Sequence, residues 1–423
     1  MNVKKLNPFE VYRGLPRSVY VLFFATIVNG MGIFVYPFLT LFLTQKLNYS
    51  IAQAGLFMFI ASLAYIPGTL IGGKLTDQVG RRLVLFVSQT LASGMFVVCG
   101  FLGTSNLVPF FILLNLFFDG FADPARQAIQ TDITTPENRQ SSFALTYLGH
   151  NLGYSVGPVI AGFLFYRASQ WLFFGNALMG FLSVLLNIAL IPETKPTKEQ
   201  LEESLKTDRT DKAVEGTLFM ALRERAGLLV FGFLISLYGL AYGQTLFSLP
   251  LSAVAVFGEE QGAGVFGKLM SLNALLVIFL NAPVVSITRR FRTLANVAFA
   301  GVLYTAGFAG FFIARTLPFF YLCTLLWTLG EIVDAVNTWY YIANHTPMSH
   351  RGRFGGIFPF ITGSGRAIAP YFGGLIIQRF GLGVLWLVTS AITTGGALGI
   401  KLLDRRSPKN DHGDRGSTSS THP

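Results

Sequence analysis

Long apolar stretches alternate with short polar segments along the whole chain, and the pattern recurs about twelve times. The predicted spans cover residues 18–44, 51–72, 83–103, 107–132, 141–165, 171–191, 227–250, 265–288, 294–314, 318–345, 354–377 and 383–403. About 20 apolar residues in a helix cross the hydrocarbon core of a bilayer, so each stretch is long enough. The pattern disfavours strands, because the alternation typical of strands is missing and open sheet edges cannot face lipid. The pattern predicts an all-α polytopic membrane protein with the lipid bilayer as its first partner.

The composition supports a membrane protein over a soluble one. The chain is 52% hydrophobic and 13% charged, and it contains 41 Phe. A soluble domain carries roughly 25% charged residues. The charges that do occur are concentrated in residues 192–225, which leaves the rest of the chain poorer still. A single soluble core is therefore excluded.

The basic residues predict how the chain is oriented. The net charge is +11, which by itself would suggest a nucleic-acid partner. The Lys and Arg residues lie in alternate loops and at the two termini, however, which is typical of the positive-inside rule. We therefore expect a multi-pass protein of the plasma membrane with both termini in the cytoplasm, and no nucleic-acid partner. Cys99 and Cys323 lie in apolar spans without nearby His or Cys, so neither a disulfide nor a metal site is expected.

The two halves of the chain resemble each other at an offset of 211 residues. At this offset Asp123 falls on Asp334, and Pro136 falls on Pro347. Six predicted spans separate the two copies, so both copies cross the membrane in the same direction. Parallel repeats of this kind enclose a central cavity between two bundles.

The repeat and the charge distribution together divide the chain into four parts. We expect a six-helix bundle in residues 1–191, a cytoplasmic linker in residues 192–225 and a second six-helix bundle in residues 226–403. The polar residues 404–423 are expected to form a disordered cytoplasmic tail.

The loop after the second span carries a recognisable motif. It reads Gly73-Lys74-Leu75-Thr76-Asp77-Gln78-Val79-Gly80-Arg81-Arg82. This sequence resembles the signature loop between helices 2 and 3 of the major facilitator superfamily. Gly73 would let a neighbouring helix approach closely, Gly80 would allow a tight turn, and Asp77 would suit a helix N-terminus. The resemblance implies a gating role for the loop, with Asp132 as the carboxylate that pairs with Arg81.

The fifth span carries a second motif. It reads Gly153-Tyr154-Ser155-Val156-Gly157-Pro158-Val159-Ile160-Ala161-Gly162 and resembles the motif of the antiporter branch of the same superfamily. Small residues at Gly153, Gly157 and Gly162 would form a smooth face for close helix packing, and Pro158 would bend the helix. The family form usually has Gly where Ala161 stands. Ordinary small-residue packing without any role in antiport remains the alternative.

Ionisable residues inside predicted spans indicate the chemistry, because each one is costly unless it is paired or hydrated. Glu331 lies about 13 residues into the tenth span, which is roughly 20 Å deep at 1.5 Å per residue. Asp334 is one turn further on, and Arg366 is at a similar depth in the eleventh span. We expect Arg366 to pair with one of these carboxylates. The other could then be neutral in one state and charged in the next, as proton-coupled transport requires.

A further resemblance points to Glu331. Residues 330–333 are similar to the helix-10 segment of certain proton-coupled multidrug antiporters, in which the Glu is associated with protons and cationic drugs. The helix-5 Asp of some of those relatives is replaced here by Thr146. His150, one turn later, is a candidate second titratable group, and a hydrogen-bonded core histidine is the alternative.

Polar residues elsewhere in the spans complete the set of candidates. Asp119 lies near the middle of the membrane and is a further candidate for proton coupling. Asp123 and Arg126 are spaced i, i+3, so they can pair on one helix face and gate the cytoplasmic side. Six more polar residues are candidates for the cavity or, alternatively, for hydrogen bonds between helices: Asn29, Tyr36, Tyr238, Tyr242, Gln244 and Asn337.

These features favour a secondary active transporter that exports hydrophobic, cationic compounds by alternating access, as a monomer and with the proton gradient as its energy source. A proton-coupled transporter of another small solute, such as a sugar, a peptide or an organic anion, is the alternative. A membrane enzyme is disfavoured, because no nucleophile–base set or metal cluster occurs within the spans. No Gly-x-x-x-x-Gly-Lys-Ser/Thr loop occurs either, so we expect no ATP and no other cofactor.

Overall fold

The computed structural model describes residues 12–134, 136–195, 226–288, 290–345 and 351–406, and within these ranges it contains helices and no strand. The first half comprises α1 (Arg17–Met31), α2 (Val35–Leu41) with a π-helical turn (Phe42–Lys46), α3 (Ile51–Val79), α4 (Arg81–Leu102), α5 (Val108–Asp132), α6 (Pro136–Tyr154), α7 (Gly157–Arg167) and α8 (Gln170–Leu190). The second half comprises α11 (Ala226–Phe257), α12 (Glu259–Thr288), α13 (Thr293–Ile313), α14 (Leu317–His345) and α15 (Arg351–Arg406).

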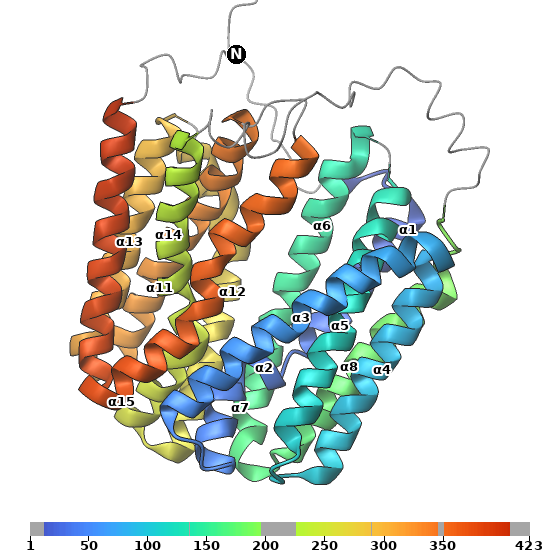
Figure 1. The fold of residues 1–423 in the computed structure, drawn as a ribbon, viewed down its shortest axis with the longest axis horizontal. Coiled ribbons are helices and arrows are strands. Elements are labelled where there is room, and N and C mark those ends of the chain that lie inside the picture. Colours follow the sequence, from blue (N-terminus) through green and yellow to red (C-terminus); the bar gives the residue numbers. More distant parts are fainter. Residues whose placement is uncertain (1–11, 135, 196–225, 289, 346–350, 407–423) are drawn as a thin grey trace, which may run out of the picture.

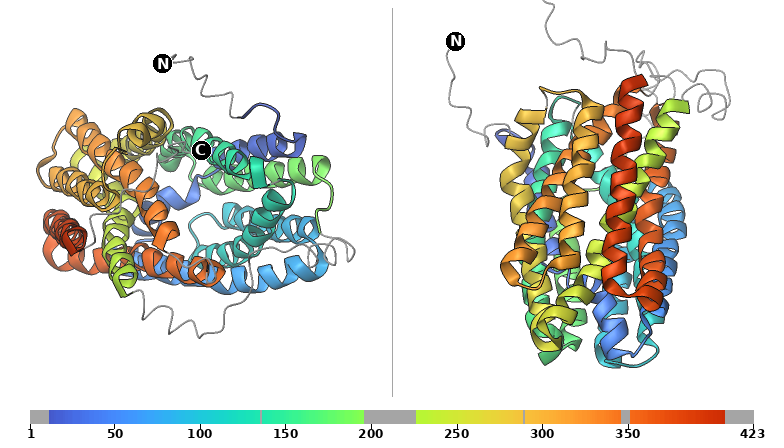
Figure 2. Two further views of the ribbon diagram at one scale, coloured as in Figure 1. Left: turned by 90° about the horizontal axis from the view of Figure 1, so that it is seen from above. Right: turned by 90° about the vertical axis from the view of Figure 1, so that its left-hand side faces the viewer.

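The helices form two bundles that lie side by side, one from each half of the chain (Figure 1). Seen from above, α1–α8 occupy one side of the molecule and α11–α15 the other (Figure 2). The helices run along a common direction, as a bundle that crosses a bilayer requires. The predicted helical membrane fold is confirmed. Residues 196–225 and 407–423, where we predicted most of the linker and the tail, lie outside the described residues.

The predicted internal repeat is visible in the helix boundaries. Adding 211 to the bounds of α4 gives 292–313, and α13 is Thr293–Ile313. The same shift places α5 on α14 and brings Asp123 onto Asp334. Pro347, the predicted counterpart of Pro136, lies outside the described residues.

The count of twelve spans is not reproduced as twelve separate helices. In the described residues, ten helices are long and apolar enough to cross a membrane. One of the ten covers two predicted spans, which are divided by a kink at Gly381, where φ is 86° and ψ is 167° and the backbone is not helical. The predicted fifth span is missing from the ten, because the helix is interrupted between Tyr154 and Gly157. Of the two pieces, α6 has 19 residues but begins with a polar run, and α7 has only 11 residues. Both differences lie where a glycine or a proline interrupts helical geometry.

The outer surface of the bundles is apolar, as a lipid-facing surface must be. Phe101 is 81% exposed, Phe279 is 70% exposed and Leu70 is 69% exposed. Apolar side chains of this size are rarely exposed together on a soluble monomer. The large apolar side chains therefore divide between a buried core and a surface covered by lipid tails.

The two halves contact each other closely at one end of the molecule. Thr40 Oγ1 donates to the carbonyl of Leu246 at 3.2 Å, and the rings of Phe38 and Phe266 meet edge to face at 5.3 Å. We call this end, where α2, α3 and α7 meet the second half, the far end (Figure 1). The opposite end carries the turn at Gly80 and the last residues of the first half, and we call it the linker end. The structure is thus closed at the far end.

The linker end is organised by Glu193, which caps the N-terminus of α4. Its carboxylate accepts hydrogen bonds from the backbone N–H groups of Arg81 at 3.0 Å and Arg82 at 3.1 Å. Partial burial raises the pKa of Glu193, but backbone donors from Lys195, Arg81, Arg82 and Thr194 outweigh burial and hold the pKa below its usual range. The first residues after α8 are therefore tied to the turn between α3 and α4.

This cap predicts a pH-dependent contribution to stability. Because the pKa of Glu193 is lower in the folded than in the unfolded protein, its contribution is complete above the unfolded pKa and disappears as pH falls through the folded pKa. We expect Glu193→Gln to lower the free energy of unfolding at pH 7 by about 0.5–1 kcal/mol. Thermal unfolding of wild type and variant from pH 7 down to about pH 3 checks this, given the usual Glu pKa of about 4.3. A difference that stays constant over this range would contradict the assignment.

Candidate functional site

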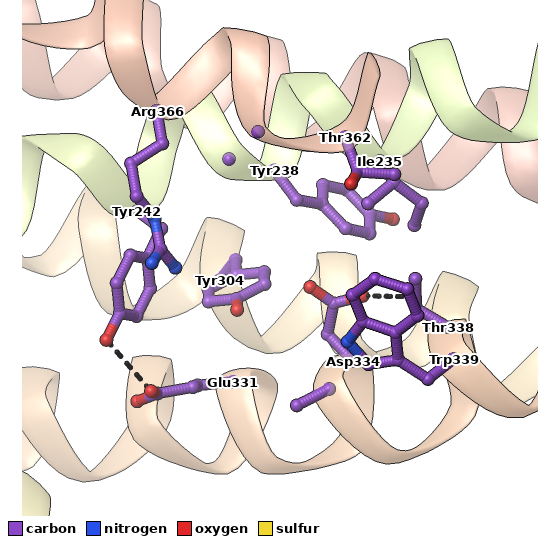
Figure 3. Close-up of a pocket in the computed structure, with 13 residues that line it drawn as sticks. Ile235, Tyr238, Tyr242, Tyr304, Glu331, Asp334, Thr338, Trp339, Thr362 and Arg366 are labelled. Atoms are coloured by element: carbon purple, nitrogen blue, oxygen red, sulfur yellow. Dashed lines mark hydrogen bonds between the residues drawn. The ribbon is translucent and has the colours of Figure 1, made fainter. Parts of the chain in front are cut away.

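The second half contains a cavity of about 320 Å³ lined by aromatic and acidic side chains. It lies between α11, α13, α14 and the first part of α15 (Figure 3). The lining residues are Ile235, Tyr238, Gly239, Tyr242, Tyr304, Glu331, Asp334, Ala335, Thr338, Trp339, Thr362, Gly363 and Arg366. We call this space the C-terminal cavity. It brings together Glu331, Asp334 and Arg366, as the sequence predicted.

Helical periodicity explains why these side chains share one space. Glu331, Asp334 and Thr338 are spaced i, i+3 and i+7 along α14, so they lie on one face of the helix. Tyr238 and Tyr242 are spaced i, i+4 along α11 and face them. The polar face of α14 is therefore directed towards the aromatic face of α11.

Both carboxylate oxygens of Glu331 accept hydrogen bonds. The hydroxyl of Tyr242 donates to Oε1 at 2.8 Å, and Nδ2 of Asn273 donates to Oε2 at 2.7 Å. The same amide group of Asn273 donates to Oγ1 of Thr328 at 3.1 Å. An ionised carboxylate accepts only, so this arrangement suits the charged form of Glu331. A proton on either oxygen would weaken the hydrogen bond that this oxygen accepts, because a neutral carboxyl group is a weaker acceptor than a carboxylate.

Arg366 lies over the ring of Tyr242, with Cζ 4.2 Å from the ring centroid (Figure 3). Among the described side chains, no ion pair joins Arg366 to Glu331 or Asp334, which differs from our prediction. A guanidinium over a Tyr face gains cation–π attraction in place of an ion pair. Tyr242 therefore contacts Arg366 with its ring and Glu331 with its hydroxyl.

The charges of the C-terminal cavity do not balance. Asp334 accepts a hydrogen bond from the hydroxyl of Thr338 at 2.7 Å, and Glu331 accepts from Tyr242 and Asn273. Two carboxylates and one guanidinium leave one negative charge when both acids are ionised. An uncompensated charge is costly at membrane depth, so the cavity favours a proton or a cationic ligand.

The candidates of the first half lie in a separate, smaller cavity. Asn29, Tyr36 and Asp119 line a space of about 130 Å³, which we call the N-terminal cavity. The predicted i, i+3 pair of Asp123 and Arg126 is present, with Nη1 and Oδ1 3.1 Å apart. Its gating role stays a prediction. Asp119 is thus placed with the first half of the chain and away from Glu331.

Three further candidates lie outside both cavities. Nε2 of Gln244 donates to the carbonyl of Ala369 at 2.8 Å, and Oδ1 of Asn337 accepts from Asn296 at 2.9 Å. These two amides therefore join helices, as in the alternative that we considered. The ring of His150 stacks on Tyr154 with centroids 6.0 Å apart. The structure does not bring His150 to the carboxylates of the C-terminal cavity.

The predicted partner of Arg81 is confirmed. Nε of Arg81 lies 3.1 Å from Oδ2 of Asp132, and Nη1 donates to the carbonyl of Thr76 at 3.1 Å. Gly80 has a φ of 124°, which explains why the turn needs glycine. Asp77 lies in α3, and its side chain is outside the described residues. Arg82 donates to the carbonyl of Ile188 and so joins α4 to α8.

The close helix approach that we predicted at Gly73 occurs at the neighbouring Gly72 instead. A Cβ at Gly73 would meet only Cβ of Pro124, at the ordinary distance of 3.9 Å. A Cβ at Gly72 would collide with the backbone of Phe121 on α5. The reason is helical phase, since neighbouring residues on a helix point about 100° apart.

The Arg81–Asp132 pair leads to a prediction about turnover. Arg81 lines neither cavity, so Arg81→Ala should leave substrate affinity within about twofold and lower the maximal transport rate about tenfold. Lys74→Ala is the matched control, because Lys74 is an exposed cation near the same turn and has no partner in the described residues. Binding and transport of a labelled substrate, measured side by side, test this. Loss of affinity at an unchanged maximal rate would argue against a gating role.

The small residues of the fifth span pack closely against two different helices. A Cβ at Gly153 would lie 2.8 Å from Cα of Gly30 on α1. A Cβ at Gly162 would lie 2.8 Å from the carbonyl oxygen of Ala263 on α12, in the other half of the protein. The helix is interrupted just before Gly157 and Pro158, as predicted from the proline. The motif therefore packs against its own half at one end and against the other half at the far end.

Several residues at the C-terminal cavity were not predicted from the sequence. Tyr304, Thr338 and Trp339 line it, and Asn273 binds Glu331 directly. Asn273 lies in an apolar span and is buried, so the cost of a buried amide was an available signal. The phase of Thr338 relative to Glu331 was a second signal. Nothing in the local sequence around Tyr304 indicated its position.

Comparison with known proteins identifies relatives over most of the chain. The family model described as Major Facilitator Superfamily matches residues 22–370. The uncharacterized MFS-type transporter YqjV of Bacillus subtilis is 25% identical over 381 residues, covering 88% of this chain and 89% of that protein. The Na(+), Li(+), K(+)/H(+) antiporter of Planococcus maritimus is 24% identical over 376 residues, covering 79% of this chain and 84% of that protein.

Two further similarities concern a shorter segment and a solved structure. The quinolone resistance protein NorA of Staphylococcus aureus is 23% identical over 261 residues, covering 60% of this chain and 66% of that protein. A crystal structure of a POT family transporter in complex with a thioalcohol-conjugated peptide has a TM-score of 0.76 at 13% identity, covering 93% of this chain and 97% of that one. At this identity the structural similarity shows the fold alone.

Proposed function

Because the chain belongs to the major facilitator superfamily, we propose that this transporter is a proton-coupled exporter of hydrophobic, cationic compounds that works by alternating access. The observation that carries the proposal is the C-terminal cavity. It combines two carboxylates with one guanidinium in a space lined by Tyr238, Tyr242, Tyr304 and Trp339. Aromatic faces and uncompensated negative charge together favour a lipophilic cation.

Coupling follows from competition for one negative charge. A cationic substrate that enters the C-terminal cavity favours ionised Glu331, so a proton leaves as the substrate binds. When a proton returns, the hydrogen bonds that Tyr242 and Asn273 donate to Glu331 become weaker, because both then reach a neutral acid in place of a carboxylate. Arg366 lies on the same Tyr242 ring, so this change reaches α15, which carries Arg366. The cavity thus links protonation to the helices that must move.

The relatives favour this proposal without establishing it. By their names, one relative is an antiporter of alkali cations and protons, and another relative is a quinolone resistance protein. Another small solute, such as a sugar, a peptide or an organic anion, is the alternative, and a solved organic anion transporter shares the fold with a TM-score of 0.65. An anion carrier would need excess positive charge in its cavity, whereas this cavity has excess negative charge when both of its acids are ionised.

The predicted orientation in the membrane indicates which state of the transport cycle the structure represents. With the linker end in the cytoplasm of a bacterial cell, as the Lys and Arg distribution predicts, closure at the far end corresponds to the inward-facing state. A cytoplasmic drug would then reach the cavity directly, as an exporter requires.

Transport in proteoliposomes tests the function. The purified protein is reconstituted, a pH gradient is imposed, and uptake is compared for lipophilic cations, neutral analogues of the same size, a dipeptide and an organic anion. We expect gradient-dependent transport of the cations only. Transport of the dipeptide or the anion, without transport of any cation, would overturn the proposal.

A further inference from the structure

The N-terminal cavity is separate from the proposed drug site and has its own unbalanced charge. It lies among α1, α2, α4, α5 and α8, in the first half of the chain. Polar side chains from these helices converge on it, among them Asn29, Ser93, Asn115, Asp119 and Asn176. Its volume of about 130 Å³ is too small for a drug-sized molecule, since pockets for such ligands hold about 300–1,000 Å³.

The nearby arginine is already engaged by other groups. Nη1 of Arg126 lies 3.1 Å from Oδ1 of Asp123, and Nη2 donates to Oε1 of Gln89 at 2.9 Å. Asp119 is 3.9 Å from Nη2, a distance too long for a hydrogen bond. Asp123 also accepts from Gln127 at 3.2 Å. Two carboxylates share one guanidinium, so one negative charge is left. Asp119 has the longer contact to Arg126, and its hydrogen bond is with the neutral side chain of Gln89.

Neutral groups with free hydrogen-bonding capacity complete the cavity. Ser93 is 6% exposed, and its hydroxyl has no partner within the described part of the chain. The side-chain amide of Asn29, which is half-buried, has none there either. A buried polar group normally finds a partner, so the Ser93 hydroxyl indicates a ligand or water inside the cavity. At about 30 Å³ per water, the volume holds roughly four water-sized particles.

The backbone beside the cavity is unwound. α1 ends at Met31 and α2 begins at Val35, and the side chain of Asn176 accepts from the N–H groups of Phe34 and Val35, each at 3.3 Å. Ile33, within the break, lines the cavity. Interrupted helices of this kind place backbone carbonyls at membrane depth, where they bind small cations in other transporters.

We propose that the N-terminal cavity binds one monovalent alkali cation of about the size of Na⁺, with Asp119 as the anionic ligand and the oxygens of Ser93 and Asn29 as neutral ligands. All three offer oxygen, which is the ligand that hard cations prefer. One net negative charge matches a monovalent ion, because Asp123 is held by Arg126 and Gln127. A proton alone would need no cavity and would leave Ser93 and Asn29 without partners. The inference goes beyond the proposed drug transport and does not depend on it.

The proposed ion competes with protons at Asp119. The charged and titratable groups that face Asp119 are Asp123 and Arg126 on its own helix, Tyr36 on α2 and Tyr65 on α3. Because a protonated Asp119 cannot serve as an anionic ligand, the apparent affinity for Na⁺ should fall as pH is lowered. Cys99 on α4 faces Tyr36, and His150 on α6 faces Arg126.

Equilibrium binding of ²²Na⁺ to the purified full-length protein in detergent tests the proposal without any transport step. We expect saturable binding that unlabelled Na⁺ displaces and choline does not. Ser93→Ala should weaken it about tenfold, which is about 1.4 kcal/mol. Asp119→Asn should abolish it. Glu331→Gln, in the other cavity, is the matched control and should bind Na⁺ like the wild type.

The outcomes of this experiment test whether Na⁺ binds in the N-terminal cavity. Absence of saturable binding, or unchanged binding in both Asp119→Asn and Ser93→Ala, would overturn the proposal. Loss of binding in Glu331→Gln alone would place the ion in the C-terminal cavity and overturn it as well. If Asp119→Asn fails to fold, Ser93→Ala still decides, because it keeps every charge. Failure of the drug-transport proposal would appear only in proteoliposome transport and would leave this result unchanged.

Discussion

Replacing Glu331 with Gln is expected to abolish export of a lipophilic cation driven by a pH gradient. Gln is nearly isosteric with protonated Glu but can neither release a proton nor attract a cation. The variant therefore mimics one state of the cycle permanently. The protein should still fold and insert, because the substitution removes an uncompensated charge from the membrane interior.

The hydrogen bonds around Glu331 indicate how the variant adapts. The Gln oxygen can accept from Tyr242, as Oε1 of Glu331 does at 2.8 Å. The Gln NH₂ group would then face Nδ2 of Asn273, which is also a donor, so the Asn273 amide must flip. After the flip, the hydroxyl of Thr328 can donate to Oδ1 of Asn273, so that hydrogen bond is kept with its direction reversed. The fold can tolerate this rearrangement.

Uptake into inverted membrane vesicles at matched expression measures the effect. We expect wild type to accumulate the cation on acidification of the vesicle interior, and Glu331→Gln to remain at background. Asp334→Asn is the matched control on the same helix face, since it also removes one carboxylate of the C-terminal cavity. Full gradient-driven transport by Glu331→Gln would exclude Glu331 as the coupling group. Loss of transport in Asp334→Asn alone would assign coupling to Asp334.

A second measurement separates coupling from binding. In wild type, binding of a cationic substrate to the detergent-solubilised protein should release protons into a weakly buffered solution. Glu331→Gln should release none. Neutral substrates of the same shape should release none from either protein, because they do not need the charged form of Glu331.

The fold and the local charge pairs followed from the sequence because they depend on short-range regularities. The spans came from the length of apolar stretches, and the pair of Asp123 and Arg126 came from their i, i+3 spacing. These two predictions need only the geometry of one helix. The pair of Arg81 and Asp132 joins α4 to the end of α5, and it was predicted only from the resemblance of the loop to a family motif.

The partner of Arg366 could not be predicted in the same way. Arg366, Tyr242 and Glu331 come from three helices, and their contacts depend on how each helix is rotated about its axis. Depth alone suggested an ion pair, but the ring of Tyr242 takes the guanidinium and its hydroxyl binds the carboxylate. Asn273 was missed for the same reason, since its helix is far from Glu331 in sequence.

The contact between halves at the far end predicts a second large effect, at Gly267. A Cβ at this position on α12 would fall well inside van der Waals contact with the carbonyl oxygen of Pro158 on α7. Backbone cannot move aside as a flexible side chain can, so a methyl group must push the two halves apart. Gly267→Ala is therefore expected to destabilise the conformation that is closed at the far end.

The expected size follows from the cost of overpacking, which is about 1–3 kcal/mol. A change of this size shifts the equilibrium between two conformations by about 5- to 150-fold. Because alternating access needs both conformations, the transport rate should fall about tenfold or more. Gly264→Ala is the matched control, since it lies one turn away on the same helix and its added Cβ would meet nothing within 4 Å.

Distances between spin labels at the far end report the conformational change directly. Asn106 and Thr316 are exposed loop residues in opposite halves, and the native cysteines Cys99 and Cys323 are buried, so labelled cysteines at the two loop positions are selective. We expect Gly267→Ala to shift the distance distribution towards longer values and Gly264→Ala to leave it unchanged. If both variants keep the wild-type distribution while Gly267→Ala loses transport, the loss does not come from opening of the far end. If both variants transport normally, the packing of Pro158 against Gly267 does not control the cycle, and the antiporter-like motif serves packing alone.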